Sequence, residues 1–358
     1  MRLYLRISSA FWSIVLLVLA GTMLVPCALS QDATPPSAPS AGQNPASGQG
    51  PGAAGRPRRI VRPGVNTPGV SRSMSDIQPI ANMAVEGSPD WSVVTKDSVW
   101  VTSGRTNHIV QLLAASNTVG LVVDVQRPCS GLADAFGSVW APSCGDHTVL
   151  RVDPATGKTI AAIPADPANS EGGITVGAGS VWIVTKPSTL ARIDPKTNTV
   201  AATYPLPSGS ENPSFGDGFL WVTSYDHDQL LKVDPATGAV VATIPVGPKP
   251  RFLTIGAGSV WTLNQGDGTI SRVDIKSGKA VATIVCGVPG SGGEISFGGG
   301  SVWATMFDFP ITQVDAATNK VVKQWGGPGG DGIRFGFGSI WLSNGRVGSV
   351  WRISPDQK

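Results

Sequence analysis

A short phrase around a tryptophan returns seven times along this chain, and it constrains the fold more than any other feature. Each phrase has an aliphatic residue directly before the tryptophan, as in "SVWTLN" and "GFLWVTS". Self-similarity at a fixed period of this length indicates a repeat architecture. The tryptophans, which are 38 to 42 residues apart, are Trp100, Trp140, Trp182, Trp221, Trp261, Trp303 and Trp341.

Each repeat divides into four short runs that have the composition of strands. In the fifth repeat these runs cover 251–256, 259–264, 269–274 and 280–286, and we name them strands A to D. β-branched residues fill the runs and turn residues separate them, which predicts antiparallel strands joined by tight turns.

The turn between strands C and D begins with an aspartate, as in "DPATGK". Its carboxylate can accept backbone N–H bonds two residues further on, and a proline after it presets the backbone. A later slot holds only glycine or asparagine, which predicts a left-handed backbone there. We therefore interpret these aspartates as turn residues. The later slot is occupied by Gly157, Asn198, Gly238, Gly278 and Asn319.

Four-stranded units of about 40 residues are typical of β-propeller blades. The seventh unit stops after strand C, and the segment 79–87 has the pattern of the missing strand D. The sequence thus predicts an all-β, seven-bladed propeller of four-stranded blades, whose last blade is closed by an N-terminal strand and leaves no open edge. In this fold each tryptophan packs against a neighbouring blade. The alternative is a ring of exposed aromatic binding sites.

The N-terminus predicts export. Arginines, an apolar run and a small-residue ending make residues 1–30 a signal peptide cut after Ser30. An uncleaved membrane anchor (11–24) and a lipoprotein modified at Cys27 are the alternatives. We expect a periplasmic or secreted bacterial protein, with no transmembrane domain in the mature chain.

Residues 31–75 are rich in proline, alanine, glycine and serine, and predict a disordered linker before a propeller at 76–358. Its segment "RPRRIVR" is either a solvated charge run or a contact for anionic surface polymers. The formal charge of +3 is too small to indicate a nucleic-acid partner. We expect a monomer.

Disulfides persist in an oxidising compartment. Cys129 and Cys144 flank the A–B hairpin of the second repeat, nearly opposite each other across the two strands, and we predict a disulfide between them. Two independent thiols are the alternative. Cys286 has no evident partner and is expected to be a buried or half-buried thiol.

The phrases "GSVWIVT" and "VDPATGAVVATIPVG" resemble those of bacterial YVTN-type surface propellers and of virginiamycin B lyase-like propellers. The resemblance covers residues 76–358. The lyase-like family implies a histidine base just before strand A and a magnesium ion held by glutamates. The corresponding position of this chain has no histidine in any repeat, although Glu171 and Glu294 lie in similar glycine-isoleucine steps. The position reads Asp90, Ser130, Gly172, Asn212, Arg251, Gly293 and Asp331.

The D–A and B–C loops share one mouth of a propeller, where loops vary on a rigid scaffold. Polar residues gather in these loops, and all three histidines lie on or beside B–C loops. A carboxylate neighbour can charge an imidazole, and histidine with carboxylates can bind a metal. No spacing of two histidines indicates such a site, so we predict no metal. The ligand-binding candidates are Asp90, Glu171, Arg251, Glu294, Asp331, Arg105, Asp226, His227, Asp308 and Arg346.

These observations favour a non-catalytic module that binds a small molecule, a peptide or a cell-surface partner through its polar mouth, without a cofactor. The alternative is a metal-assisted, Mg²⁺-dependent lyase that acts on cyclic depsipeptides. No nucleophile motif or phosphate-binding loop was found to support another class of enzyme.

Overall fold

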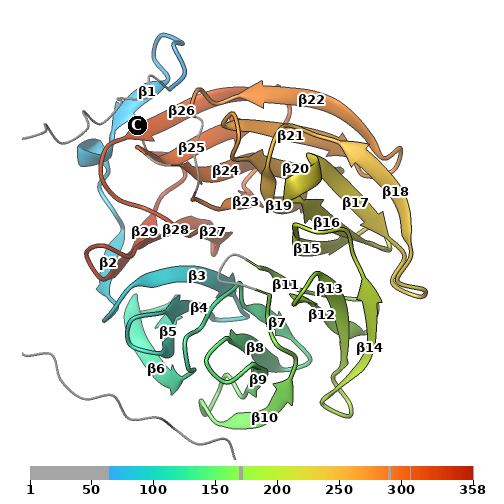
Figure 1. Ribbon diagram of the computed structural model, residues 1–358. Coiled ribbons are helices and arrows are strands. Elements are labelled where there is room, and N and C mark those ends of the chain that lie inside the picture. Colours follow the sequence, from blue (N-terminus) through green and yellow to red (C-terminus); the bar gives the residue numbers. More distant parts are fainter. Residues whose placement is uncertain (1–63, 169–171, 289–291, 307, 358) are drawn as a thin grey trace, which may run out of the picture. The chain divides into compact units, whose positions relative to one another are not determined.

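The computed structural model describes residues 64–168, 172–288, 292–306 and 308–357. Within them the strands form seven antiparallel four-stranded sheets around a common centre (Figure 1). The signal peptide, most of the linker and Glu171 lie outside the described residues. Blades 1 to 3 consist of β3 (Pro89–Val94), β4 (Ser98–Ser103), β5 (His108–Leu113) and β6 (Thr118–Asp124); β7 (Ala133–Ala135), β8 (Ser138–Ser143), β9 (Thr148–Val152) and β10 (Thr159–Pro164); and β11 (Ile174–Gly177), β12 (Ser180–Thr185), β13 (Thr189–Asp194) and β14 (Thr199–Pro205).

Blades 4 to 7 repeat the same arrangement, and the seventh takes its fourth strand from the N-terminal side. A short 3₁₀ helix, η2 (Tyr225–His227), lies in the B–C loop of blade 4. The strands are β15 (Ser210–Gly216), β16 (Phe219–Ser224), β17 (Gln229–Val233) and β18 (Val240–Pro245); β19 (Pro250–Gly256), β20 (Ser259–Asn264), β21 (Thr269–Asp274) and β22 (Lys279–Val285); β23 (Ile295–Gly298), β24 (Ser301–Met306), β25 (Phe309–Asp315) and β26 (Lys320–Gly326); and β27 (Ile333–Gly336), β28 (Ser339–Asn344), β29 (Ser349–Ile353) and β2 (Ala81–Ala84).

The predicted closure of the ring is confirmed. β2 pairs antiparallel with β29, with Asn82 opposite Trp351. The first part of the described chain therefore completes the sheet that the last part begins, and the blue and red ends of the ribbon meet in Figure 1. This arrangement leaves blade 7 with the same four strands as the other blades.

An N-terminal arm precedes the boundary expected at residue 76. β1 (Ser71–Ser73) adds a parallel fifth strand to the outer edge of β26, and η1 (Met74–Asp76) follows it. Met74 and Ile77 are buried in one apolar cluster with Trp325. The arm is ordered because its apolar residues cover the outer part of this cluster.

The seven repeated tryptophans are core residues, as predicted. All are at most 1% exposed, and each lies in an apolar cluster with the following blade. In Trp261, for example, the indole packs with Ile295 and Val302 of blade 6. Its Nε1 donates to the carbonyl oxygen of Gly256 at 3.0 Å, which satisfies the one polar atom of the ring.

Three arginines add a second contact between neighbouring blades. Each lies opposite the tryptophan of its own blade and reaches the C–D turn of the next blade. The asparagine there has a left-handed backbone, which was predicted for Asn198 and Asn319 but not for Asn117. The arginine–asparagine pairs, whose Nη1–Oδ1 distances are 2.8–2.9 Å, are Arg151–Asn198, Arg272–Asn319 and Arg352–Asn117.

No helix among the described residues has the length and apolarity needed to cross a membrane.

Candidate functional site

The strand register gathers the D–A and B–C loops at one mouth of the ring. In blade 4, Ser210 at the start of strand A pairs with Ser224 at the end of strand B, and Gln229 at the start of strand C pairs with Pro245 at the end of strand D. The loops before strand A and after strand B therefore lie at the same edge. The A–B and C–D turns lie at the other edge.

At this mouth, Arg251 joins the loops of blades 4 and 5. Its Nε lies 3.3 Å from Oε2 of Glu211, and its guanidinium lies 4.5 Å from the ring centroid of Tyr225. Lys249 approaches the same ring at 5.7 Å. The backbone carbonyl oxygen of Arg251 accepts hydrogen bonds from Asn212 Nδ2 at 2.9 Å and Thr223 Oγ1 at 2.8 Å. The result is a rigid wall with one aromatic ring, two cations and a carboxylate.

Asp226 and His227 follow Tyr225 in η2. Together with Arg251 they are three of the predicted candidates, and the structure places all three on this part of the mouth. Asp226 and His227 are both exposed residues. His227 Nδ1 lies 3.1 Å from Oγ of Ser224. Asp226 covers Gly209, where a Cβ atom would lie 2.5 Å from its carboxyl carbon. We infer that the glycine is needed for this close approach.

Glu294 is more deeply buried than a candidate at an open mouth would be, with 3% exposure. Its Oε1 lies 2.5 Å from Nη2 of Arg334 in blade 7, and its Oε2 accepts the backbone N–H of Ile333 at 2.7 Å. Arg334 in turn donates from Nε to the carbonyl oxygen of Ser92 at 2.7 Å. This pair ties blades 6, 7 and 1 together.

Asp331 and Arg346 form another part of the mouth, in blade 7. Burial among neighbouring atoms raises the pKa of Asp331, while the backbone N–H of Gly293 and the charge of Arg346 oppose that rise. Of the other candidates, Asp90 and Asp308 are half-buried and Arg105 is exposed. The carbonyl oxygen of Asp90 accepts a hydrogen bond from Ser343 Oγ at 2.6 Å.

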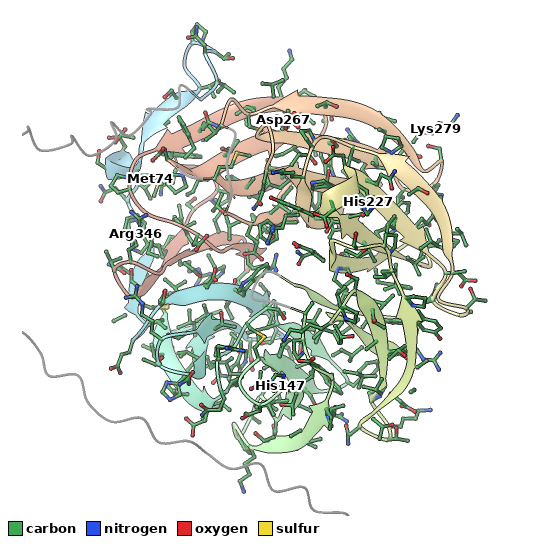
Figure 2. The ribbon with its side chains drawn as sticks, viewed as in Figure 1. Met74, His147, His227, Asp267, Lys279 and Arg346 are labelled. Atoms are coloured by element: carbon green, nitrogen blue, oxygen red, sulfur yellow. A yellow bond between two sulfur atoms is a disulfide. The ribbon has the colours of Figure 1, made fainter. Side chains whose placement is uncertain are left out.

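The three histidines lie in different blades, and Figure 2 shows His147 and His227 far apart on the ring. His108 pairs with Asp124 at 3.0 Å. His147 pairs with Asp166 at 2.7 Å, and Lys186 lies 3.4 Å from the same carboxylate oxygen. These contacts lower the pKa of Asp166, and the hydrogen bond from His147 contributes most.

Magnesium needs several oxygen ligands in octahedral geometry. Among the described residues, no three histidine, cysteine, aspartate or glutamate side chains come close enough to share an ion. Glu294, the described glutamate that the resemblance points to, has both oxygens engaged by Arg334 and Ile333. The donor set in this part of the chain does not fit magnesium.

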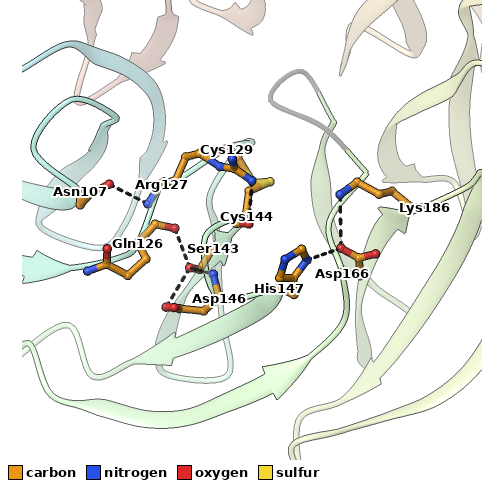
Figure 3. The surroundings of a disulfide bond; sticks show 10 residues. All are labelled: Asn107, Gln126, Arg127, Cys129, Ser143, Cys144, Asp146, His147, Asp166 and Lys186. Carbon is orange, nitrogen blue, oxygen red and sulfur yellow. Dashed lines mark hydrogen bonds and ion pairs between the residues drawn. A yellow bond between two sulfur atoms is a disulfide. The ribbon is translucent and has the colours of Figure 1, made fainter. Parts of the chain in front are cut away.

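The predicted disulfide is confirmed at the D–A side of blade 2. Cys129 and Cys144 are bonded, with a Cα–Cα distance of 5.7 Å. The register of β7 and β8 shifts before it reaches the cysteines, because Pro128 pairs with Ser143; the two cysteines directly follow the members of this pair along the chain. Figure 3 shows Arg127 beside the disulfide, where its Nη2 donates to the carbonyl oxygen of Cys144 at 2.8 Å. Cys286 is a free, buried thiol whose pKa burial raises to about 12.

The centre of the ring contains two aromatic residues that were not among the predicted candidates. Trp91 of blade 1 meets Phe252 of blade 5 edge to face, with 5.3 Å between ring centroids. Both side chains occupy the position nine residues before the repeated tryptophan. A signal was present, because that position differs strongly among the repeats: it reads Trp91, Gly131, Gly173, Asn212, Phe252, Glu294 and Gly332.

Comparison with known proteins supports this architecture. A streptogramin B lyase structure is similar to this chain. The two match with a TM-score of 0.66 and 18% sequence identity, over 76% of this chain and 96% of the lyase chain. At this identity the likeness shows a shared β-propeller fold. No protein-family model and no curated protein matches the chain.

Proposed function

We propose that this protein is an exported β-propeller that binds a small molecule or peptide at the mouth formed by its D–A and B–C loops, without catalysing a reaction. One observation carries the proposal. The charged groups beside Tyr225 are held by opposite charge, in the pair Glu211–Arg251. Groups fixed in this way recognise a ligand by charge and shape, and they do not transfer protons easily.

The wall around Tyr225 supplies the contacts that a ligand needs. Its ring offers apolar surface, and Arg251 and Lys249 offer charge beside it. Aromatic and arginine side chains are common anchors of binding sites. The disulfide supports export, since such bonds persist in oxidising compartments.

A binding experiment with short peptides that end in a free carboxylate tests this proposal. We expect Tyr225→Ala to weaken peptide binding roughly tenfold, because the ring and its cation contacts are lost. Phe337→Ala is the matched control, since Phe337 is an exposed aromatic residue in the A–B turn of blade 7, on the opposite face. Equal affinity of the Tyr225→Ala variant and the wild type would refute binding at this mouth.

The likeness to a streptogramin B lyase makes a lyase the second candidate. Elimination opens a cyclic depsipeptide by moving a proton from carbon to the departing carboxylate, so the mass of the product is unchanged. Incubation of a type B streptogramin with the protein, followed by chromatography and fragmentation, therefore detects ring opening and separates it from hydrolysis, which adds water. Turnover that a chelator abolishes would overturn the non-catalytic proposal.

A further inference from the structure

A cavity of about 290 Å³ lies at the centre of the ring, on the side of the A–B turns. In six of the seven blades its lining starts nine residues before the repeated tryptophan and continues along strand A, and blade 7 contributes Arg334. Of the candidates predicted at the mouth, Glu294 contributes to the lining, whereas Arg251, Asp331 and Asp226 do not. Strand A runs from the mouth toward the A–B turn. The cavity therefore lies deeper in the ring than the residues ten places before each tryptophan, such as Arg251 and Asp331.

Trp91 and Phe252 form the apolar end of this cavity. The two side chains are 6% and 2% exposed, and both contribute to the lining. A Cβ atom on Gly131 would lie 3.6 Å from the indole of Trp91. The glycine leaves room for the indole at the axis.

Three hydroxyl groups from successive blades line the wall. Thr175, Ser214 and Thr254 each lie directly opposite the repeated tryptophan of their own blade, and all three residues are half-buried. Within the described chain, none of these hydroxyls hydrogen-bonds to another residue. Each hydroxyl has one donor and two acceptor sites. The wall therefore presents hydrogen-bonding capacity that no protein group uses.

The lining has three charged residues, two of which neutralise each other. Arg334 and Glu294 form an ion pair, and Asp134 lies at the outer part of the cavity. Arg334 has five N–H donors, and its contacts with Ser92, Ile295 and Glu294 use one donor on each nitrogen. The guanidinium can therefore still donate to a ligand oxygen while its charge is compensated by Glu294.

We propose that this cavity binds a neutral polyhydroxylated molecule of about monosaccharide size. The aromatic rings contact the C–H face of the ligand, and the three hydroxyls and Arg334 hydrogen-bond to its oxygens. The volume lies just below the roughly 300–1,000 Å³ of ordinary ligand pockets, which favours a small ligand. The paired charges disfavour an ionic ligand. The site is distinct from the mouth and does not depend on the function proposed for it.

Isothermal titration calorimetry with glucose, mannitol, glucuronate and glucosamine tests the proposal. We expect saturable binding of at least one of the neutral probes, and weaker binding of the two charged sugars. The combined Thr175→Val, Ser214→Ala and Thr254→Val variant loses hydroxyls while it nearly keeps side-chain volume. It should bind the neutral probe roughly tenfold to a hundredfold less tightly.

Thr243→Val is the matched control, because Thr243 is exposed on β18 at the outer edge of blade 4. It should bind like the wild type. If the combined variant does not fold, Thr254→Val alone provides the comparison. Absence of saturable binding of both neutral probes, or unchanged affinity in a folded hydroxyl variant, would show that the cavity holds only water. Tighter binding of glucuronate or glucosamine would also overturn the proposal.

Discussion

Two positions of each blade differ sharply in how much their residue varies among the seven repeats. The tryptophan of strand B is identical in all seven repeats, whereas the residue nine places before it ranges from glycine to tryptophan. The tryptophan serves seven equivalent interfaces between blades. The other position faces the axis of the ring, which exists only once.

This difference shows where symmetry helps a propeller and where it does not. Seven equal interfaces are all satisfied by one large apolar residue that buries some 150–250 Å². Seven large residues cannot share a single axis. Trp91 therefore occupies the centre with Phe252, and Gly131 leaves it room. Chemical variety is concentrated at the centre and the mouth for this geometric reason.

The largest loss of stability should follow the removal of a packing contact that is repeated between all blades. Trp261→Ala removes the indole that packs on blade 6, and it should destabilise the protein by roughly 3–5 kcal/mol. Chemical denaturation monitored by circular dichroism measures this. Val285→Ala, at a side chain of 66% exposure on β22, should change stability by less than about 0.5 kcal/mol. Similar effects of the two changes would contradict the assigned core role.

The second-largest loss of stability should follow the removal of a contact that occurs only once in the ring, the Arg334–Glu294 ion pair. Arg334→Leu leaves the carboxylate of Glu294 buried without its cation, which should cost about 3 kcal/mol. The Arg334→Leu, Glu294→Gln double variant should recover most of that loss, since no buried charge remains. Denaturation of both variants forms the test. No recovery in the double variant would show that the arginine acts mainly through its bonds to the Ser92 and Ile295 carbonyls.

The disulfide of blade 2 has no counterpart in the other blades within the described residues. Replacement of Cys129 and Cys144 by serine opens a loop of 15 residues and should cost up to about 3 kcal/mol. The midpoint of thermal unfolding of the variant, compared with that of reduced wild-type protein, measures the loss. An unchanged midpoint in both would show that strand pairing alone fixes this hairpin.

The arginine clamps between blades should contribute less. Asn319→Gly keeps the left-handed backbone and removes only the oxygen that Arg272 contacts at 2.8 Å, so a loss of about 1 kcal/mol is expected. Asn319→Ala should cost more, because alanine tolerates φ of 58° less well. Equal losses in the two variants, measured by denaturation, would argue against a backbone contribution.

The smallest expected effect is the dependence of stability on pH that Asp166 contributes. The pKa of Asp166 is lowered, first by His147 and then by Lys186. Its ionised form therefore stabilises the fold above the ordinary carboxyl pKa, and this contribution is lost as the pH falls through the lowered value. His147→Ala should raise the midpoint of Asp166 in an NMR titration toward that of an ordinary aspartate. An unmoved midpoint would assign the shift to Lys186 alone.

Much of the fold could be predicted because a repeat tests each assignment several times. The predicted strands of blade 5 agree with β19 to β22 to within one residue. The candidate site was harder. Arg251 and Glu211 lie ten residues before the tryptophan in adjacent blades; the sequence comparison wrongly put Asn212 in the place of Glu211. Nothing in the sequence indicates that the two side chains form an ion pair over Tyr225. Arg334 was missed because it occupies a strand position where other blades have threonine, serine, valine or alanine.

The sequence by itself determined the number of blades, the strands within them, the closure by β2 and the cysteine pair. These features depend on local pattern and on contacts that recur at one period. Only the tertiary structure decided what lies at the axis, including the Trp91–Phe252 contact, the Glu294–Arg334 pair and the three hydroxyls around the cavity. Each of these contacts joins different blades around a single centre, so no repeated spacing in the sequence can reveal it.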